Sequence, residues 1–126
     1  MPRTNYARGR EIEYKAISEL KNKYYCFLSH RTSGSHSKVD VFGVPPSFVF
    51  FVQLKRTKDG RFPKKELEDL KNMAENLKND SVVFGFWVWQ DRKGFVKKVM
   101  FVRSEKTADA LRMLDDCEIV LLGDSS

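Results

Sequence analysis

Two short apolar segments on either side of a Pro-Pro pair constrain the fold more than any other part of the sequence. Residues 39–44 and 48–55 are rich in valine and phenylalanine and are bounded by turn-forming residues, a pattern that predicts two β-strands. The connection between them, centred on Pro45 and Pro46, is too short for a crossover. We therefore expect the two strands to be antiparallel neighbours in one sheet.

Three polar residues stand at the ends of these apolar strands. Asp40 lies at the start of the first strand, and Gln53 and Lys55 lie at the end of the second. Because successive side chains alternate between the two faces of a strand, Gln53 and Lys55 share one face. Such residues are out of place in an apolar strand unless they have a function, so the pattern indicates a functional site.

The rest of the sequence alternates between helical and extended patterns. Apolar residues recur at helical spacing in residues 9–23 and 66–78, which predicts two amphipathic helices. We expect a single α/β domain over residues 1–126, with a central mixed β-sheet flanked by helices. Residues 1–8 are interpreted as a mobile arm. The other expected elements are strand 24–29, hairpin strands 82–90 and 95–103, helix 107–114 and strand 118–122.

Glu13 falls within the apolar stripe of the first predicted helix. At 100° per residue it lies between Ile12 and Ile17, whereas Glu11 lies on the opposite, solvent-facing side. Burying a carboxylate is costly unless it is paired or binds a metal. Two interpretations of Glu13 remain open: a structural salt bridge with a lysine or arginine, and a helix-borne acid that reaches a metal site.

The charge of the chain favours a polyanionic partner. The formal net charge is +6 and the isoelectric point is about 9.4. Small hydroxyl and basic residues in 30–38 suit a loop that follows a phosphate backbone, and a second basic segment, 56–65, comes directly after the predicted site. Solvated polar loops are the alternative for both segments. The candidate DNA-binding residues are Arg8, Arg31, Ser33, Ser35, Lys38, Lys58, Arg61 and Lys64.

The cysteines and the hydropathy favour a cytoplasmic protein. Cys26 and Cys117 show no CxxC spacing, which is more typical of reduced thiols in or near a core than of a disulfide scaffold. No apolar run approaches the ~20 residues needed to cross a bilayer, and the basic N-terminus lacks the hydrophobic region of a signal peptide. We therefore expect no membrane partner.

The polar residues at the strand ends resemble the PD-(D/E)XK nuclease superfamily, in which an acid begins one strand and an acid-x-lysine triplet ends the next. The matching residues are Asp40 and the triplet Gln53-Leu54-Lys55, with glutamine where an acid is usual. Together with residues 8–13, which lead into the rest of the first helix, and the segment 31–35, this arrangement is similar to the archaeal Holliday junction resolvases. The resemblance covers roughly residues 8 to 80.

The resemblance implies a restriction-endonuclease-like fold and a metal-dependent, structure-selective DNA endonuclease. Glu13, Asp40 and Gln53 would hold Mg²⁺, for which Mn²⁺ is able to substitute, together with the backbone carbonyl of Leu54. Lys55 would orient or help deprotonate the attacking water. The expected substrate is a four-way DNA junction, cleaved by a homodimer.

Other functions and the dimer contact are separate expectations. A duplex endonuclease of restriction, repair or homing type is one alternative, and the glutamine at position 53 leaves open a non-catalytic DNA-binding module. We expect the dimer contact to use part of the aromatic hairpin, residues 84–101, because a partner usually covers large apolar side chains that a sheet exposes.

Overall fold

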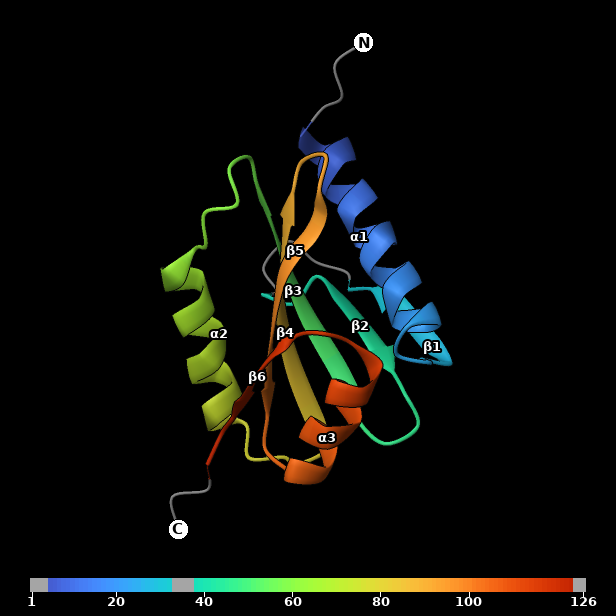
Figure 1. Ribbon diagram of the computed structural model, residues 1–126, viewed down its shortest axis with the longest axis vertical. Helices are drawn as coiled ribbons and strands as arrows, with labels where there is room; N and C mark the ends of the chain where they lie inside the picture. Colours follow the sequence, from blue (N-terminus) through green and yellow to red (C-terminus); the bar gives the residue numbers. More distant parts are fainter. Residues whose placement is uncertain (1–4, 33–37, 124–126) are drawn as a thin grey trace.

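A computed structural model of the chain describes residues 5–32 and 38–123. Within these residues the chain forms a six-stranded sheet with the strand order β1-β2-β3-β4-β5-β6, flanked by helices on both faces (Figure 1). The elements, in chain order, are α1 (Asn5–Asn22), β1 (Leu28–Arg31), β2 (Val41–Val44), β3 (Val49–Thr57), α2 (Lys64–Asn76), β4 (Val82–Gln90), β5 (Gly94–Val102), α3 (Glu105–Leu114) and β6 (Glu118–Leu121).

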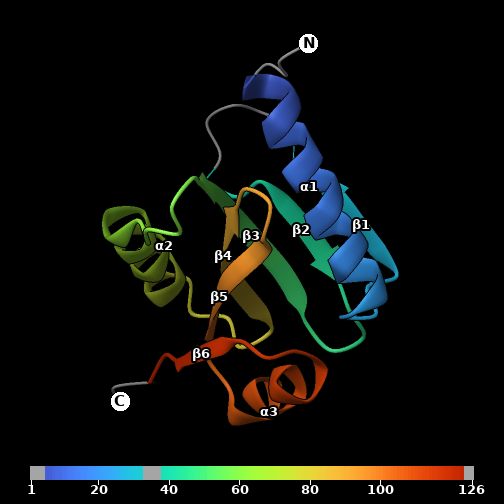
Figure 2. The ribbon, with the colours of Figure 1, turned by 45° about the horizontal axis from the view of Figure 1, so that its top comes forward.

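The sheet is mixed, as predicted. The pairs β1–β2, β2–β3 and β4–β5 are antiparallel, whereas β3–β4 and β5–β6 are parallel and are joined through α2 and α3. Figures 1 and 2 show α2 alone on one face of the sheet, with α1 and α3 on the other. The α/β class, the antiparallel pair around the prolines and the hairpin β4–β5 are confirmed.

Two predicted element boundaries in the N-terminal part are wrong. Helix α1 begins at Asn5, so residues 5–8 belong to the helix and not to a mobile arm. Gly9 lies inside this helix, where glycine is less favourable than alanine by only about 0.5 to 1 kcal/mol. The first strand begins at Leu28 and not at residue 24, because Tyr25 has a left-handed backbone conformation with φ of 59°, which no strand accommodates.

The core contains two apolar layers, one on each face of the sheet. Ala16 and Leu20 of α1 and Leu111 of α3 pack on the face that carries Phe50 and Trp87. Leu70 and Ala74 of α2 cover the opposite face, which carries mainly side chains of β4 and β5. No helix in the described part of the chain is both long and apolar enough to span a membrane.

The aromatic hairpin is central in the sheet and does not form an exposed apolar surface. Phe86 and Trp87 of β4 are fully buried, and Phe101 of β5 is nearly so. Trp87 belongs to the core layer on the face that α1 and α3 cover. Most large side chains of the hairpin are covered within the chain, whereas Val96 near its tip is exposed, and the dimer contact stays a prediction.

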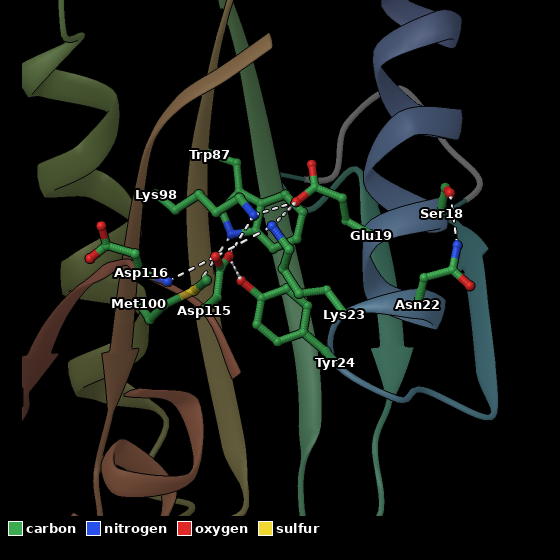
Figure 3. Close-up of polar contacts among 10 residues, drawn as sticks. All are labelled: Ser18, Glu19, Asn22, Lys23, Tyr24, Trp87, Lys98, Met100, Asp115 and Asp116. Atoms are coloured by element: carbon green, nitrogen blue, oxygen red, sulfur yellow. Dashed lines mark hydrogen bonds and ion pairs between the residues drawn. The ribbon is translucent and has the colours of Figure 1, made fainter. Parts of the chain in front are cut away.

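A buried ionic network joins α1, β5 and the segment after α3 (Figure 3). Lys98 Nζ lies 2.5 Å from Glu19 Oε1 and 2.7 Å from Asp115 Oδ2, and it is 4.4 Å from the centre of the Trp87 ring. The Tyr24 hydroxyl donates a further hydrogen bond to Asp115. These contacts connect residues 79 and 91 positions apart in the chain.

Candidate functional site

The predicted catalytic residues come together at one end of the sheet. Asp40 immediately precedes β2, Gln53 and Lys55 lie in the second half of β3, and Glu13 lies in α1. Figures 1 and 2 show that α1 begins and β3 ends at this same end of the sheet. The antiparallel register of β2 and β3 makes this possible, because an early position of one strand meets a late position of the other.

Asp40 is held against the backbone of β3. Its backbone N–H donates to the Val52 carbonyl at 2.9 Å, and its Oδ2 accepts from the Leu54 N–H at 2.7 Å. The pKa of Asp40 is raised to about 6, mainly by burial and also by the negative charge of Glu13. The hydrogen bond from Leu54 and the positive charge of Lys55 act in the opposite direction and lower the pKa. The site therefore lacks the positive charge that would keep this carboxylate fully ionised.

Gln53 presents a buried acceptor next to Asp40. Gln53 comes directly before Leu54, whose N–H bonds the Asp40 carboxylate, and directly after Val52, whose carbonyl accepts from the Asp40 N–H. The Gln53 Oε1 is buried and accepts no hydrogen bond from the described residues. Buried polar atoms are almost always hydrogen-bonded, so an amide oxygen in this position has the chemistry of a ligand for a hard cation.

The backbone carbonyl of Leu54 lies on the side of β3 that faces Asp40. The N–H and C=O of one strand residue point toward the same neighbouring strand. The Leu54 N–H is bonded to Asp40, so the Leu54 carbonyl also points toward the β2 side of β3. The backbone geometry fits the predicted contribution of Leu54 to a metal site.

Lys55 contacts a residue that the sequence reasoning missed. Its Nζ lies 3.5 Å from Oε1 of Glu66, in the first turn of α2, and both side chains are partly exposed. The pKa of Glu66 is lowered, first by a hydrogen bond from its own backbone N–H; burial opposes this, and the charge of Lys55 lowers the pKa further. The sequence could have indicated Glu66, because it is an acid in the first turn of the helix that follows the strand with Lys55. Helix α2 returns along the face of the sheet that carries Lys55.

Glu13 pairs with Arg31 and also acts on Asp40. Arg31 Nε donates to Glu13 Oε1 at 3.1 Å, and both side chains are only partly exposed. The structure therefore contains the salt bridge expected in one of the two interpretations of Glu13. Its charge nevertheless contributes to the raised pKa of Asp40, so the two carboxylates lie in one electrostatic site. Arg31, predicted to contact DNA, is held at this site by Glu13.

The other predicted DNA-binding residues divide into two groups. Lys38 is exposed just before Asp40, and Lys58 and Arg61 are exposed in the loop from β3 to α2, with Lys64 at the start of α2. They surround the end of the sheet that carries Asp40. Ser33 and Ser35 lie outside the described residues, as does the side chain of Arg8.

The number of acidic side chains at the site is small. Within residues 5–32 and 38–123, no group of three or more His, Cys, Asp or Glu side chains is placed to hold a metal ion. Glu13 and Asp40 supply two carboxylates, and any further ligands come from the Gln53 amide and a backbone carbonyl. Such an oxygen-only set suits Mg²⁺ or Mn²⁺ better than a soft metal.

Comparison of the chain with protein-family models, with curated proteins and with solved structures found no match.

Proposed function

We propose that this chain is a Mg²⁺-dependent DNA endonuclease with a restriction-endonuclease-like fold. The observation that supports this most is the buried Gln53 Oε1, which accepts no hydrogen bond from the described residues, in the strand segment whose Leu54 N–H holds the Asp40 carboxylate, with its pKa raised to about 6. The Gln53 oxygen has no hydrogen-bond donor among the described residues, and burial disfavours the charged form of Asp40. A divalent cation held by both groups would give the Gln53 amide oxygen a partner and would offset the negative charge of the Asp40 carboxylate.

The residues around this pair have separate roles. Asp40, Gln53 and the Leu54 carbonyl would hold Mg²⁺, which, when bound, activates water and neutralises charge on the phosphate. The Lys55 side chain lies on the same face of β3 as Gln53, and its ion pair with Glu66 keeps the Lys55 ammonium group near the site. The ammonium orients the attacking water and stabilises the negative charge that develops on the phosphate. Glu13 orients Arg31 toward the DNA backbone.

The proposed substrate is branched DNA, in particular a four-way junction, cleaved in the cytoplasm by a homodimer. The basic surface around the site, including Lys38 and Arg61, fits the close approach of more than one DNA arm. A non-catalytic DNA-binding module is the second candidate, favoured because no three His, Cys, Asp or Glu side chains of the described residues are placed to hold a metal ion together. A duplex endonuclease is distinguished only by its substrate.

Cleavage is tested with a labelled mobile four-way junction and a linear duplex, each with and without Mg²⁺. We expect Mg²⁺-dependent nicks in the junction and much weaker cleavage of the duplex. Equal cleavage of both substrates would indicate the duplex endonuclease. Tight binding with no cleavage in Mg²⁺ or Mn²⁺ would leave the non-catalytic module.

Substitution of Gln53 is expected to change the metal requirement. Gln53→Glu should lower the Mg²⁺ concentration for half-maximal activity, because a carboxylate binds Mg²⁺ more strongly than an amide. Gln53→Ala should raise it. The measurement is a Mg²⁺ titration of junction cleavage, with Glu105→Gln, an exposed residue in the first turn of α3, as the control. If all three variants titrate like the wild type, Gln53 is not a ligand.

Affinity for DNA is expected to fall steeply with salt. Each phosphate neutralised by a lysine or arginine contributes about −0.9 to the slope of log K against log salt. If Lys38, Lys58, Arg61 and Lys64 each neutralise one phosphate, they should contribute roughly −3.6 together. Fluorescence anisotropy with labelled DNA at several salt concentrations measures this slope. An affinity independent of salt would exclude this surface as the DNA-binding face.

A further inference from the structure

The turn between β4 and β5 is a basic protrusion at the same end of the sheet as the candidate site. It contains Asp91, Arg92 and Lys93, and the last two are exposed. Figure 1 shows this turn, in orange, at the end of the sheet where β3 ends and α1 begins. Neither Arg92 nor Lys93 is among the residues to which the sequence pattern assigned a role.

This turn is firmly attached to the strand that carries Lys55. Arg56, the next residue, donates from Nε and from one terminal guanidinium nitrogen to the two carboxylate oxygens of Asp91, at 2.8 and 2.6 Å. The Asp91 N–H also donates to the Thr57 carbonyl at 3.3 Å. A bidentate pair of this kind fixes orientation as well as distance. Movement of the turn relative to Lys55 is therefore restricted.

The same turn is connected to the basic loop after β3. Gln90 Nε2 donates to the Lys58 carbonyl at 3.5 Å, and a Cβ added to Gly60 would lie 2.8 Å from Gln90 Oε1. This close approach, with φ of 77° at position 60, requires glycine there. The loop with Lys58 and Arg61 and the turn with Arg92 and Lys93 thus form one continuous rim.

The charge of the turn is directed outward. Arg56 neutralises Asp91, so Arg92 and Lys93 keep their positive charges at the exposed tip. Arg92 has φ of 71°, a conformation that glycine or asparagine adopts at lower cost than arginine. An arginine in this position is unfavourable for the backbone alone, and the site at the same end of the sheet provides a reason for its charge.

We propose that the β4–β5 turn is a second DNA-binding element, in which Arg92 and Lys93 contact backbone phosphates of a DNA arm that extends from the scissile position past α1. The inference rests on the proposed function, because it takes DNA as the partner of the same end of the sheet. It extends the predicted DNA surface to a part of the chain beyond residue 80. The contact is to phosphates and is therefore independent of base sequence.

Arg92→Gly separates a binding role from a structural role. Glycine accepts the observed φ, so the melting temperature should stay the same or rise, whereas affinity for DNA should fall. We expect the double change Arg92→Gly with Lys93→Ala to reduce the magnitude of the salt slope by about 2, or about 1 for each lost phosphate contact. Lys106→Ala, an exposed lysine in α3 away from this end, is the matched control for Lys93→Ala and should leave the slope unchanged.

Binding is measured by anisotropy in EDTA, and cleavage is measured separately in Mg²⁺. A salt slope equal to that of the wild type in the double variant, or a loss in Lys106→Ala as large as that in Lys93→Ala, would overturn the assignment of the turn. If the double variant has a reduced salt slope but the wild type never cleaves DNA, the turn is a DNA-binding element and the protein is not a nuclease. If the wild type cleaves DNA but the double variant has an unchanged salt slope, the nuclease is supported and the role of the turn is rejected. If the wild type does not bind DNA, both proposals are rejected.

Discussion

Asp40→Asn is expected to make the protein more stable at pH 7 in the absence of metal while removing metal-dependent cleavage. The pKa of Asp40 is raised to about 6 in the folded protein, mainly by burial, against about 3.9 in an unfolded chain. The folded state therefore binds more protons between these two values, and the free energy of unfolding falls as the pH rises from about 4 to about 6. At pH 7 the ionised carboxylate opposes folding by about 1 to 3 kcal/mol.

Asparagine removes this charge and keeps an oxygen that accepts from the Leu54 N–H. Urea unfolding at pH 7 and pH 4.5 measures the difference, and the gain in stability should be smaller at the lower pH. Asp59→Asn is the control, because the ionised Asp59 carboxylate has the opposite effect on the free energy of unfolding. The pKa of Asp59 is lowered, first by the Arg61 N–H, so its ionised form favours folding and its replacement should not stabilise.

Metal gives an independent test of the same residue. If Asp40 is a ligand, Mg²⁺ or Mn²⁺ should raise the melting temperature of the wild type, because a ligand that binds only the folded state stabilises it. Asp40→Asn should lose most of this response. A variant that is no more stable than the wild type, or that responds equally to metal, would contradict the assignment of Asp40 to a cation site.

Asp115→Ala is expected to destabilise the fold by about 3 to 5 kcal/mol, the range for removal of one partner from a buried ion pair. Burial alone would raise the pKa of Asp115, but hydrogen bonds from Lys98 and Tyr24 and the charges of Lys98 and Lys23 hold it below its ordinary value. Without Asp115, the Lys98 ammonium, only 7% exposed, keeps Glu19 as its one close carboxylate, and the Tyr24 hydroxyl loses its acceptor.

Urea unfolding of Asp115→Ala, Lys98→Met and the double variant gives the coupling between the two side chains. The double variant should be less destabilised than the sum of the single changes, because no unpaired charge remains between them. Asp109→Ala, which breaks the exposed ion pair with Arg112, is the control and should change stability by no more than about 0.5 kcal/mol. A loss below about 1 kcal/mol in Asp115→Ala would show that water replaces the carboxylate.

The elements that could be predicted from the sequence are those with a strong local pattern. The alternation around Gln53 placed the polar residues of β3 on one face, and the two prolines required an antiparallel return. The position of Glu13 on the apolar side of α1 predicted a partner, and the structure provides Arg31. These inferences need only neighbours in the chain or periodicity.

The features that were missed depend on contacts between distant segments. Lys98 reads as a solvent-facing lysine in a strand, and only the approach of α1 and the segment after α3 buries it with its two carboxylates. Tyr24 and Tyr25 are both apolar and aromatic, which favours a strand, yet Tyr24 fills the core and Tyr25 turns the chain with a positive φ. Glu66 became part of the site only through the return of α2 over Lys55.

The parallel pairing of β3 with β4 has a consequence for the newly synthesised chain. Glu13, Asp40, Gln53, Lys55 and Glu66 all leave the ribosome before β4, yet β3 pairs with β4 at nine positions, from Val49↔Val82 to Thr57↔Gln90. Until residue 90 has emerged, β3 has an open edge of unpaired backbone groups, and the strand that carries the site has no fixed position. A nascent chain thus contains every proposed catalytic side chain without an assembled site, and the proposed activity would require β4 to be in place.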